Sequence, residues 1–211
     1  MRLNKSGFTL IELLVVITLI GILALAVLSA LNPIEQINKA ADSRRRGDSA
    51  QLIQALDRYF ASNEQFPWNS SSFTSGRVES VDGEFKQKAS IAGIGVCGGE
   101  AATEDGAGSS GCQENGLLII SQELKAQFTK RPYFKISPTL NDTLYVIKEA
   151  GDPSVSVCFV PTAKATREQL GRLKKVDLNA TPSITACEEA PSGNDAWTTA
   201  ETSCFWCIPE D

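Results

Sequence analysis

The most informative absence in this 211-residue chain is histidine, of which there is not one. Histidine is the commonest general base near neutral pH and the commonest metal ligand. Hydrolases with a Ser-His-Asp triad and histidine-ligated zinc or haem sites are therefore disfavoured. Whole-chain disorder and collagen-like repetition are excluded, because 42% of the residues are hydrophobic and 21% are charged, with a net charge of −5. The acidic total also argues against a nucleic-acid binder that uses its whole surface.

Charge is scarce near the N-terminus, where the 24 residues from Phe8 to Leu31 include one ionisable side chain, Glu12. As a helix this stretch is roughly 36 Å long, enough to cross a hydrocarbon core of about 30 Å. Past residue 62 the composition changes: this part of the chain has 13 basic and 20 acidic residues and a net charge of −7. The sequence predicts a membrane helix over 8–31, an amphipathic helix over 32–62 and a globular head over 63–211.

The orientation of this helix in the membrane follows from its flanking charges and from the cysteines. Arg2 and Lys5 precede the apolar run and favour a cytoplasmic N-terminus, whereas the basic residues at 44–46 pull the other way. The six cysteines decide between the two orientations. An even number of cysteines is typical of a disulfide-bonded domain, and disulfides persist outside the cytoplasm. We expect the head to lie outside the cytoplasm.

A cleaved secretory signal or a simple membrane anchor does not account for Glu12. A secretory signal has an apolar core of about 7–15 residues and small residues at its cleavage site. Here the run is longer, and a simple anchor would not place a carboxylate five residues into it, at a cost of about 2.5–3.5 kcal/mol at a bilayer centre. Such a group is usually functional.

The segment around Glu12 reads KSGFTLIELLVV, residues 5–16. It resembles the class III signal of type IV pilins and type II secretion pseudopilins. The resemblance implies that a prepilin peptidase cuts between Gly7 and Phe8 on the cytoplasmic side, removing the leader 1–7, and methylates the new amine of Phe8. It also implies an assembly role for Glu12. The implied partners are the membrane, further copies and other pilins, an assembly platform and its cytoplasmic ATPase.

The expected fold is α+β, with a long N-terminal helix that breaks near Pro33 and packs its second half on a small antiparallel sheet. Asn32 can cap the second helix, and Pro33 suits its first position. One helical face of 34–62 carries Ile34, Ile37, Ala41, Leu52, Ile53, Leu56 and Phe60. The basic run at 44–46 is interpreted as a solvated or subunit-facing surface.

In the head, strands are predicted at 131–137, 143–150 and 154–161, the last two joined as a hairpin, with a short helix over 117–128. Cys97 and Cys112 bracket a glycine-rich loop and are predicted to pair, which is worth roughly 3 kcal/mol for a loop of about 15 residues. Cys158, Cys187, Cys204 and Cys207 leave three pairings, of which those that tie the C-terminal segment to the body are favoured.

No catalytic residue, cofactor or metal site is proposed. The spacing Cys204-x-x-Cys207 also fits a membrane-anchored thiol oxidoreductase, but this pair lacks the helix start near a βαβ unit where such motifs lie. The favoured function is a structural subunit of a pilus-like filament, first in the membrane and then extracellular. The alternative is a pseudopilin or minor tip pilin whose head binds a partner or DNA, although no motif indicates nucleic acid.

Overall fold

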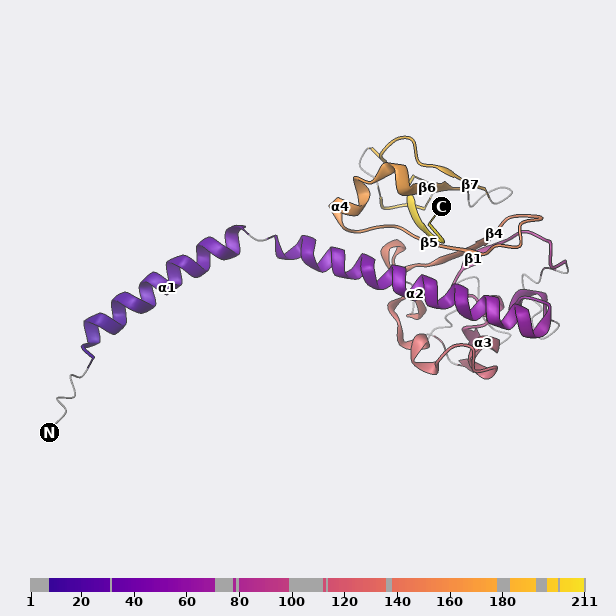
Figure 1. Ribbon diagram of the computed structural model, residues 1–211, viewed down its shortest axis with the longest axis horizontal. Coiled ribbons are helices and arrows are strands. Elements are labelled where there is room, and N and C mark those ends of the chain that lie inside the picture. Colours follow the sequence, from indigo (N-terminus) through magenta and orange to yellow (C-terminus); the bar gives the residue numbers. More distant parts are fainter. Residues whose placement is uncertain are drawn as a thin grey trace.

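The chain opens with two long helices in succession (Figure 1). The computed structural model describes residues 8–30, 32–70, 78, 80–98, 112, 114–135, 138–177, 183–192, 197–200 and 202–210. Helix α1 spans Leu10–Ala30 and α2 spans Pro33–Asn63. Figure 1 shows α1 projecting away from the rest of the molecule, while α2 lies along the head. The predicted apolar N-terminal helix is therefore confirmed.

The break between the two helices is built from the residues that the sequence singles out. Asn32 has an extended backbone and caps α2, since its Oδ1 accepts a hydrogen bond from the Glu35 N–H at 3.2 Å. Pro33 takes the first helical position, where its missing N–H has no partner to lose. The local chemistry ends one helix and starts the next.

Helix α2 buries an apolar face only in its C-terminal half. Leu52, Ala55 and Leu56 are fully buried there, and Tyr59 continues the row one turn later. The predicted face does not extend to the N-terminal half, because Ile34 and Ile37 are 69% and 68% exposed. That end of α2 contacts the head through polar groups instead.

The larger sheet has the order β1-β4-β5-β8-β6-β7, with every neighbouring pair antiparallel. Its strands are β1 (Phe85–Lys88), β4 (Tyr145–Lys148), β5 (Ser156–Phe159), β6 (Leu173–Val176), β7 (Ile184–Ala186) and β8 (Phe205–Ile208). A two-stranded ladder joins β2 (Cys97–Gly98) to β3 (Glu114–Asn115), and two short helices complete the head, α3 (Leu117–Ile120) and α4 (Lys164–Arg167). The predicted α+β class is confirmed.

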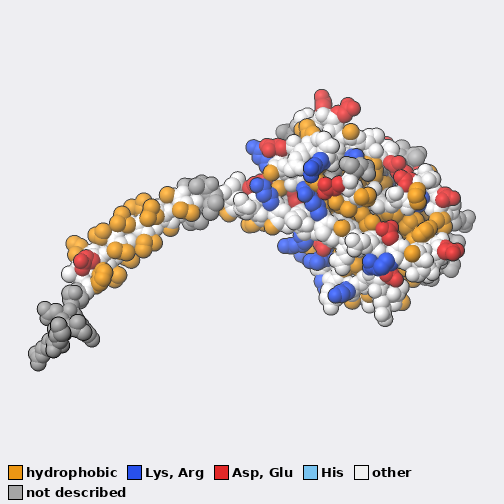
Figure 2. All heavy atoms as spheres, in the orientation of Figure 1, with side chains coloured by type: hydrophobic (Ala, Val, Ile, Leu, Met, Phe, Trp, Pro, Cys, Tyr) orange, Lys and Arg blue, Asp and Glu red, His pale blue; other side chains and the backbone are white. Residues whose placement is uncertain are grey.

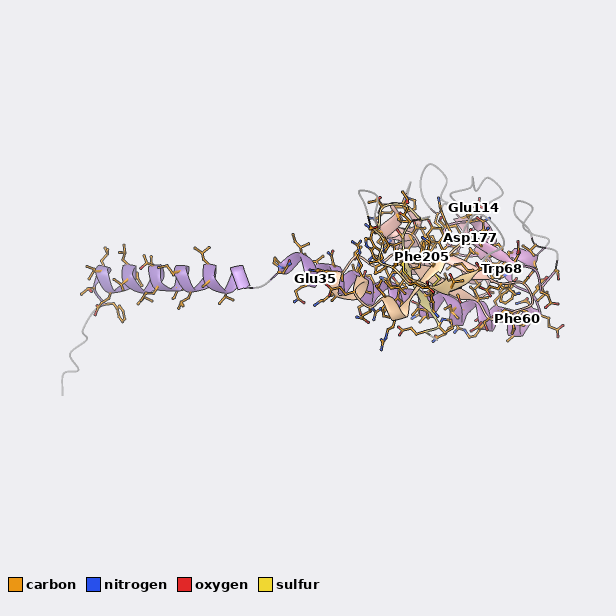
Figure 3. All side chains as sticks on the ribbon, turned by 90° about the horizontal axis from the view of Figure 1, so that it is seen from above. Glu35, Phe60, Trp68, Glu114, Asp177 and Phe205 are labelled. Atoms are coloured by element: carbon orange, nitrogen blue, oxygen red, sulfur yellow. A yellow bond between two sulfur atoms is a disulfide. The ribbon has the colours of Figure 1, made fainter. Side chains whose placement is uncertain are left out.

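The sheet has a hydrophobic layer on each face. One layer joins α2 to Val146, Val157, Phe159 and Trp206, and it continues into a stack of Phe60, Phe66, Trp68 and Phe85 with ring centroids 4.2–4.7 Å apart. Figure 3 shows Phe60 and Trp68 at the end of α2 away from α1. The second, smaller layer contains Tyr145, Ile147, Val176 and Phe205. The alternation of a strand's side chains produces both layers.

Two of the three predicted strands are confirmed, and they form the predicted hairpin as β4 and β5. Its turn contains Gly151 at a φ of 75°, a conformation that glycine adopts without strain. The strand predicted at 131–137 is wrong. Pro132 has no N–H for a ladder and starts a 3-10 helix, Pro132–Phe134, while 136–137 lie outside the described residues. The helix predicted over 117–128 ends at Ile120, and a 3-10 helix follows at Ala126–Lys130.

Three disulfides tie the head together. Cys97 bonds Cys112, which is the pair that the sequence favours, and most of the loop between them lies outside the described residues. Cys158 on β5 bonds Cys207, its register partner on β8, and Cys187 bonds Cys204. Both bonds connect the C-terminal segment to the body of the head.

Candidate assembly site

The start of α1 is a capping box made by Thr9 and Glu12. Thr9 immediately precedes the helix, and its N–H and Oγ1–H donate to Glu12 Oε2 at 2.9 and 2.7 Å. In return the Glu12 N–H donates to Thr9 Oγ1 at 3.3 Å. This reciprocal pattern satisfies two donors that the first turn of a helix would otherwise leave unpaired. In the uncleaved chain the carboxylate of Glu12 is therefore shielded by its own neighbour.

Thr9 is the site residue that sequence reasoning missed. The spacing Thr-x-x-Glu directly before an apolar run is the sequence signature of a capping box, so the signal was present. Gly7, on the leader side of the proposed cleavage point, lies outside the described residues. Phe8 is described and is 81% exposed, so nothing in the head covers the residue after the proposed cut.

From Leu10 to Val27 the surface of α1 is apolar on all sides, and it contacts no described part of the head (Figure 1). None of the residues Leu10–Val27 is buried, and the segment is long and apolar enough to cross a membrane. Figure 2 shows hydrophobic side chains covering the visible face of this helix, with one acidic group near its start. A helix that is hydrophobic all round needs an apolar surrounding, either lipid or other helices. No described residue of this chain supplies that surrounding for Leu10–Val27.

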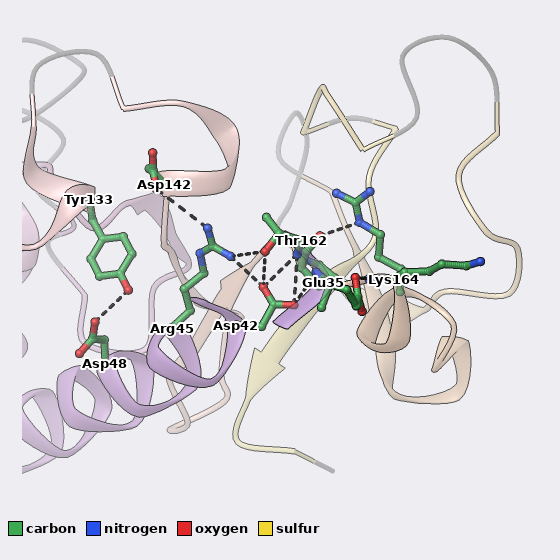
Figure 4. Close-up of polar contacts among 11 residues, drawn as sticks. Glu35, Asp42, Arg45, Asp48, Tyr133, Asp142, Thr162 and Lys164 are labelled. Carbon is green, nitrogen blue, oxygen red and sulfur yellow. Dashed lines mark hydrogen bonds and ion pairs between the residues drawn. The ribbon is translucent and has the colours of Figure 1, made fainter. Parts of the chain in front are cut away.

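The N-terminal half of α2 is joined to the head by two carboxylates (Figure 4). Asp42, which is 1% exposed, accepts hydrogen bonds from the N–H groups of Thr162 and Ala163, both at 2.9 Å, and from Thr162 Oγ1 at 2.8 Å. Glu35 accepts from the N–H groups of Lys164 and Ala165, both at 3.1 Å. The two acids thus satisfy the free N–H groups at the start of α4.

Glu35 is half-buried, and hydrogen bonds from the N–H groups of Ala165 and Lys164 hold the pKa of its carboxyl below the ordinary value. The unfolded chain therefore binds the proton more readily than the folded one. The stability that this contact contributes is present above the ordinary pKa of about 4.3 and is lost as the pH falls through the lowered value.

The basic run at 44–46 is not a uniformly solvated surface, and the interpretation as a solvated or subunit-facing surface was wrong for Arg45, which is buried. Arg45 is 7% exposed, and its guanidinium lies 2.7 Å from Asp42 Oδ1 and 3.0 Å from Thr162 Oγ1. The guanidinium of Arg46 lies 3.6 Å from the ring centroid of Trp206, where it makes a cation–π contact. Only Arg44 is exposed.

One turn further along α2, Asp48 continues the row of buried acids. Its Oδ2 accepts a hydrogen bond from the Tyr133 hydroxyl at 2.9 Å, and its Oδ1 lies 3.2 Å from Arg131 Nη2. Burial and the Asp48 carboxylate raise the pKa of Tyr133, so the phenol stays protonated and remains a donor. We call Glu35, Asp42, Arg45 and Asp48 the polar junction. It includes the groups that these side chains bind, which belong to Arg131, Tyr133, Thr162, Ala163, Lys164 and Ala165.

Among the residues that the structure describes, the geometry offers neither a metal cluster nor a redox dithiol. No group of three or more potential ligands comes together among the described residues. Cys204 and Cys207 are bonded to Cys187 and Cys158 and not to each other. A C-x-x-C redox centre cycles through a bond between its own two sulfurs, and this arrangement does not provide one.

Replacing Asp42 by asparagine is predicted to lower the free energy of unfolding by about 3–5 kcal/mol. The buried Arg45 would lose its nearest carboxylate, at 2.7 Å, and keep only that of Asp142, at 3.9 Å. Tryptophan fluorescence during urea unfolding of the full chain in detergent measures this change. Glu35→Gln is the matched control and should cost less, since Glu35 is only half-buried. An Asp42→Asn chain as stable as the wild type would show that the junction carries no stability.

Comparison with known proteins adds one finding at the N-terminus. Residues 2–28 match the family model described as the prokaryotic N-terminal methylation motif, and no curated protein or solved structure matches the chain. The matched range contains Gly7, Phe8, Thr9 and Glu12 and most of α1. This motif is the class III signal peptide of type IV pilins and pseudopilins. It indicates a pilin-like or pseudopilin-like precursor, and it implies processing by prepilin peptidase and assembly with other pilins.

Proposed function

We propose that the chain is a structural subunit of a type IV pilus or pilus-like filament, built by polymerisation of its N-terminal helix. The observation that carries the proposal is α1, an apolar helix with no buried residue between Leu10 and Val27 and a single carboxylate at its start. Lipid covers this helix before assembly, and the α1 helices of neighbouring copies replace lipid in the filament. The methylation motif over residues 2–28 supports the same route.

The head lies outside the cytoplasm in this proposal. Three disulfides join segments that are 15, 49 and 17 residues apart, and such bonds persist in oxidising compartments. The polar junction binds α2 to the head, so any reorientation of the head relative to α1 occurs before Pro33. No residue is assigned a catalytic role.

Glu12 exchanges one partner for another during assembly. In the uncleaved chain its carboxylate is bound by Thr9. Cleavage after Gly7 gives Phe8 a positively charged amine, which the Glu12 of an incoming copy can approach. Opposite charges attract by several kcal/mol in a medium of low effective dielectric, before their desolvation is subtracted. This attraction sets the axial register, because a misplaced subunit leaves both charges unpaired among apolar helices.

The mature protein is predicted to begin at Phe8 and to carry a methylated amine. The expected mass corresponds to residues 8–211, which is 204 residues, with one amine hydrogen replaced by a methyl group and two hydrogens lost for each of the three disulfides. Intact-mass measurement of assembled material tests this, with material from cells that lack prepilin peptidase as the unprocessed control. Residues 1–7 retained in assembled material would overturn the proposed processing.

Glu12→Ala and Glu12→Val are predicted to be inserted and cleaved normally but to assemble poorly. Glu12→Gln keeps an oxygen that can accept the hydrogen bonds from Thr9 and removes only the negative charge. It should also assemble poorly, because the proposed intersubunit pair depends on that charge. We expect at least about a tenfold loss of filaments, the effect of roughly 1.4 kcal/mol per contact.

The matched control is Thr9→Val, which removes the hydroxyl and keeps the carboxylate. It should retain most filaments, because the proposed intersubunit pair needs Glu12 and the Phe8 amine only. Filaments are counted by electron microscopy, and processing is checked by mass. Normal filament numbers from Glu12→Gln, with processing intact, would show that the charge of Glu12 has no role in assembly.

A further inference from the structure

A groove on one flank of α2 carries three cationic side chains and no carboxylate. Its volume is about 330 Å³, and it is lined by Gln51, Lys125, Gln127, Phe128, Lys130 and Arg131. Gln51 comes from α2, and the other residues come from the 3-10 helix Ala126–Lys130 and its two flanking positions. We call this surface the basic groove.

The charge of the basic groove is largely unneutralised. Lys125 and Lys130 are exposed, and neither pairs with a carboxylate of the described residues. Arg131 contacts Asp48 with one nitrogen and keeps 42% of its side chain exposed. The groove therefore suits an anionic group. Phe128, its aromatic lining residue, is only 3% exposed, so the groove offers no ring on which a nucleic-acid base could stack.

The same head carries exposed acids at the end away from α1. Asp82 and Glu84 precede β1, and Asp152 lies in the turn between β4 and β5. The two loops meet, since the Gly151 N–H donates to the Asp82 carbonyl at 2.9 Å. A hydrogen bond from the Ser154 N–H lowers the pKa of Asp152 and keeps its carboxyl ionised. We call Asp82, Glu84 and Asp152 the acidic tip.

The two charged surfaces lie on different parts of the head. Figure 1 shows the β4–β5 turn at the end of the molecule farthest from α1. On the face drawn in Figure 2, that far end shows acidic and no basic side chains. Because the surfaces differ, a contact between them is heterologous. The copy that uses its groove keeps its tip free, and the copy that uses its tip keeps its groove free, so the contact does not close on a pair.

We propose that the basic groove of one copy receives the acidic tip of a neighbouring copy. The inference rests on the proposed function in so far as a filament brings the heads together, and it adds a second contact between copies besides α1. We choose a second copy as the partner because the charges are complementary. The groove is lined by cationic side chains and no carboxylate, and the acidic tip of another copy supplies exposed carboxylates. The contact is expected to weaken as salt is raised, because all its charges are solvent-accessible.

Zero-length cross-linking of the processed full chain tests this contact. Unlabelled and 15N-labelled copies are mixed at high density in lipid vesicles, and a carbodiimide couples lysines to carboxylates that touch. Mass spectrometry should find mixed-isotope links from Lys125 or Lys130 to the acidic tip. Lys164 is the internal control, because it is 82% exposed on α4 and lies outside the groove.

Charge-reversed chains sharpen the result. The double variant Lys125→Glu, Lys130→Glu loses the groove's coupling lysines. It is mixed with a tip variant, Asp82→Lys, Asp152→Lys, so that the new lysines of the tip can couple to the new carboxylates of the groove. Links of this reversed polarity should form in the mixture. Either variant alone lacks one of the two coupling groups and serves as the blank. The Lys164→Glu chain should keep the wild-type links.

Each outcome decides the matter. Absence of mixed-isotope links to the acidic tip, in vesicles and in sheared filaments, overturns the proposal. Binding of duplex DNA that is lost in the groove variant, without such links, assigns the groove to nucleic acid and also overturns it. Links in vesicles from a chain that never forms filaments would support this contact and contradict the proposed function, so the two failures are distinct.

Discussion

The structure depends on one constraint: α1 is apolar on every side from Leu10 to Val27, and no described residue of the head covers it. Every residue from Leu10 to Val27 is unburied, whereas α2 uses the head to bury its own apolar half. Lipid can cover α1 in one state and neighbouring α1 helices can cover it in another. The one carboxylate on this surface is tolerable because Thr9 binds it at the first turn, close to where the membrane interface would lie.

The two halves of α2 explain how a head can be attached to such a helix. Its C-terminal half packs Leu52 and Leu56 against the sheet, and its N-terminal half is bonded through Asp42 and Glu35 to the start of α4. A buried charge is favourable only when its hydrogen bonds and ion pairs are satisfied. The Asp42 carboxylate accepts hydrogen bonds from four donor groups. The polar half leaves Ile34 and Ile37 exposed.

Local chemistry determined most of what the sequence predicts correctly. The length of α1, the cap at Asn32 and Pro33, the β4–β5 hairpin around Gly151 and the Cys97–Cys112 bond all depend on neighbouring residues. The failures involve partners distant in sequence. Nothing near Arg45 and Arg46 indicates that their side chains will contact Thr162 and Trp206, more than 110 residues away. The segment 131–137 looks like a strand by composition, but Pro132 cannot donate to a ladder. Thr9 was predictable in principle from its spacing to Glu12.

A reconstruction of filaments sheared from cells that express this chain tests the central claim most directly. The account predicts α1 helices bundled in the filament core, heads outside, and the Glu12 carboxylate of each copy within ion-pair distance of the Phe8 amine of a neighbour. Mass spectrometry of the same filaments should identify residues 8–211 as a subunit. Filaments in which α1 lies at the surface, or in which Glu12 still binds Thr9 and contacts no neighbouring amine, would contradict it.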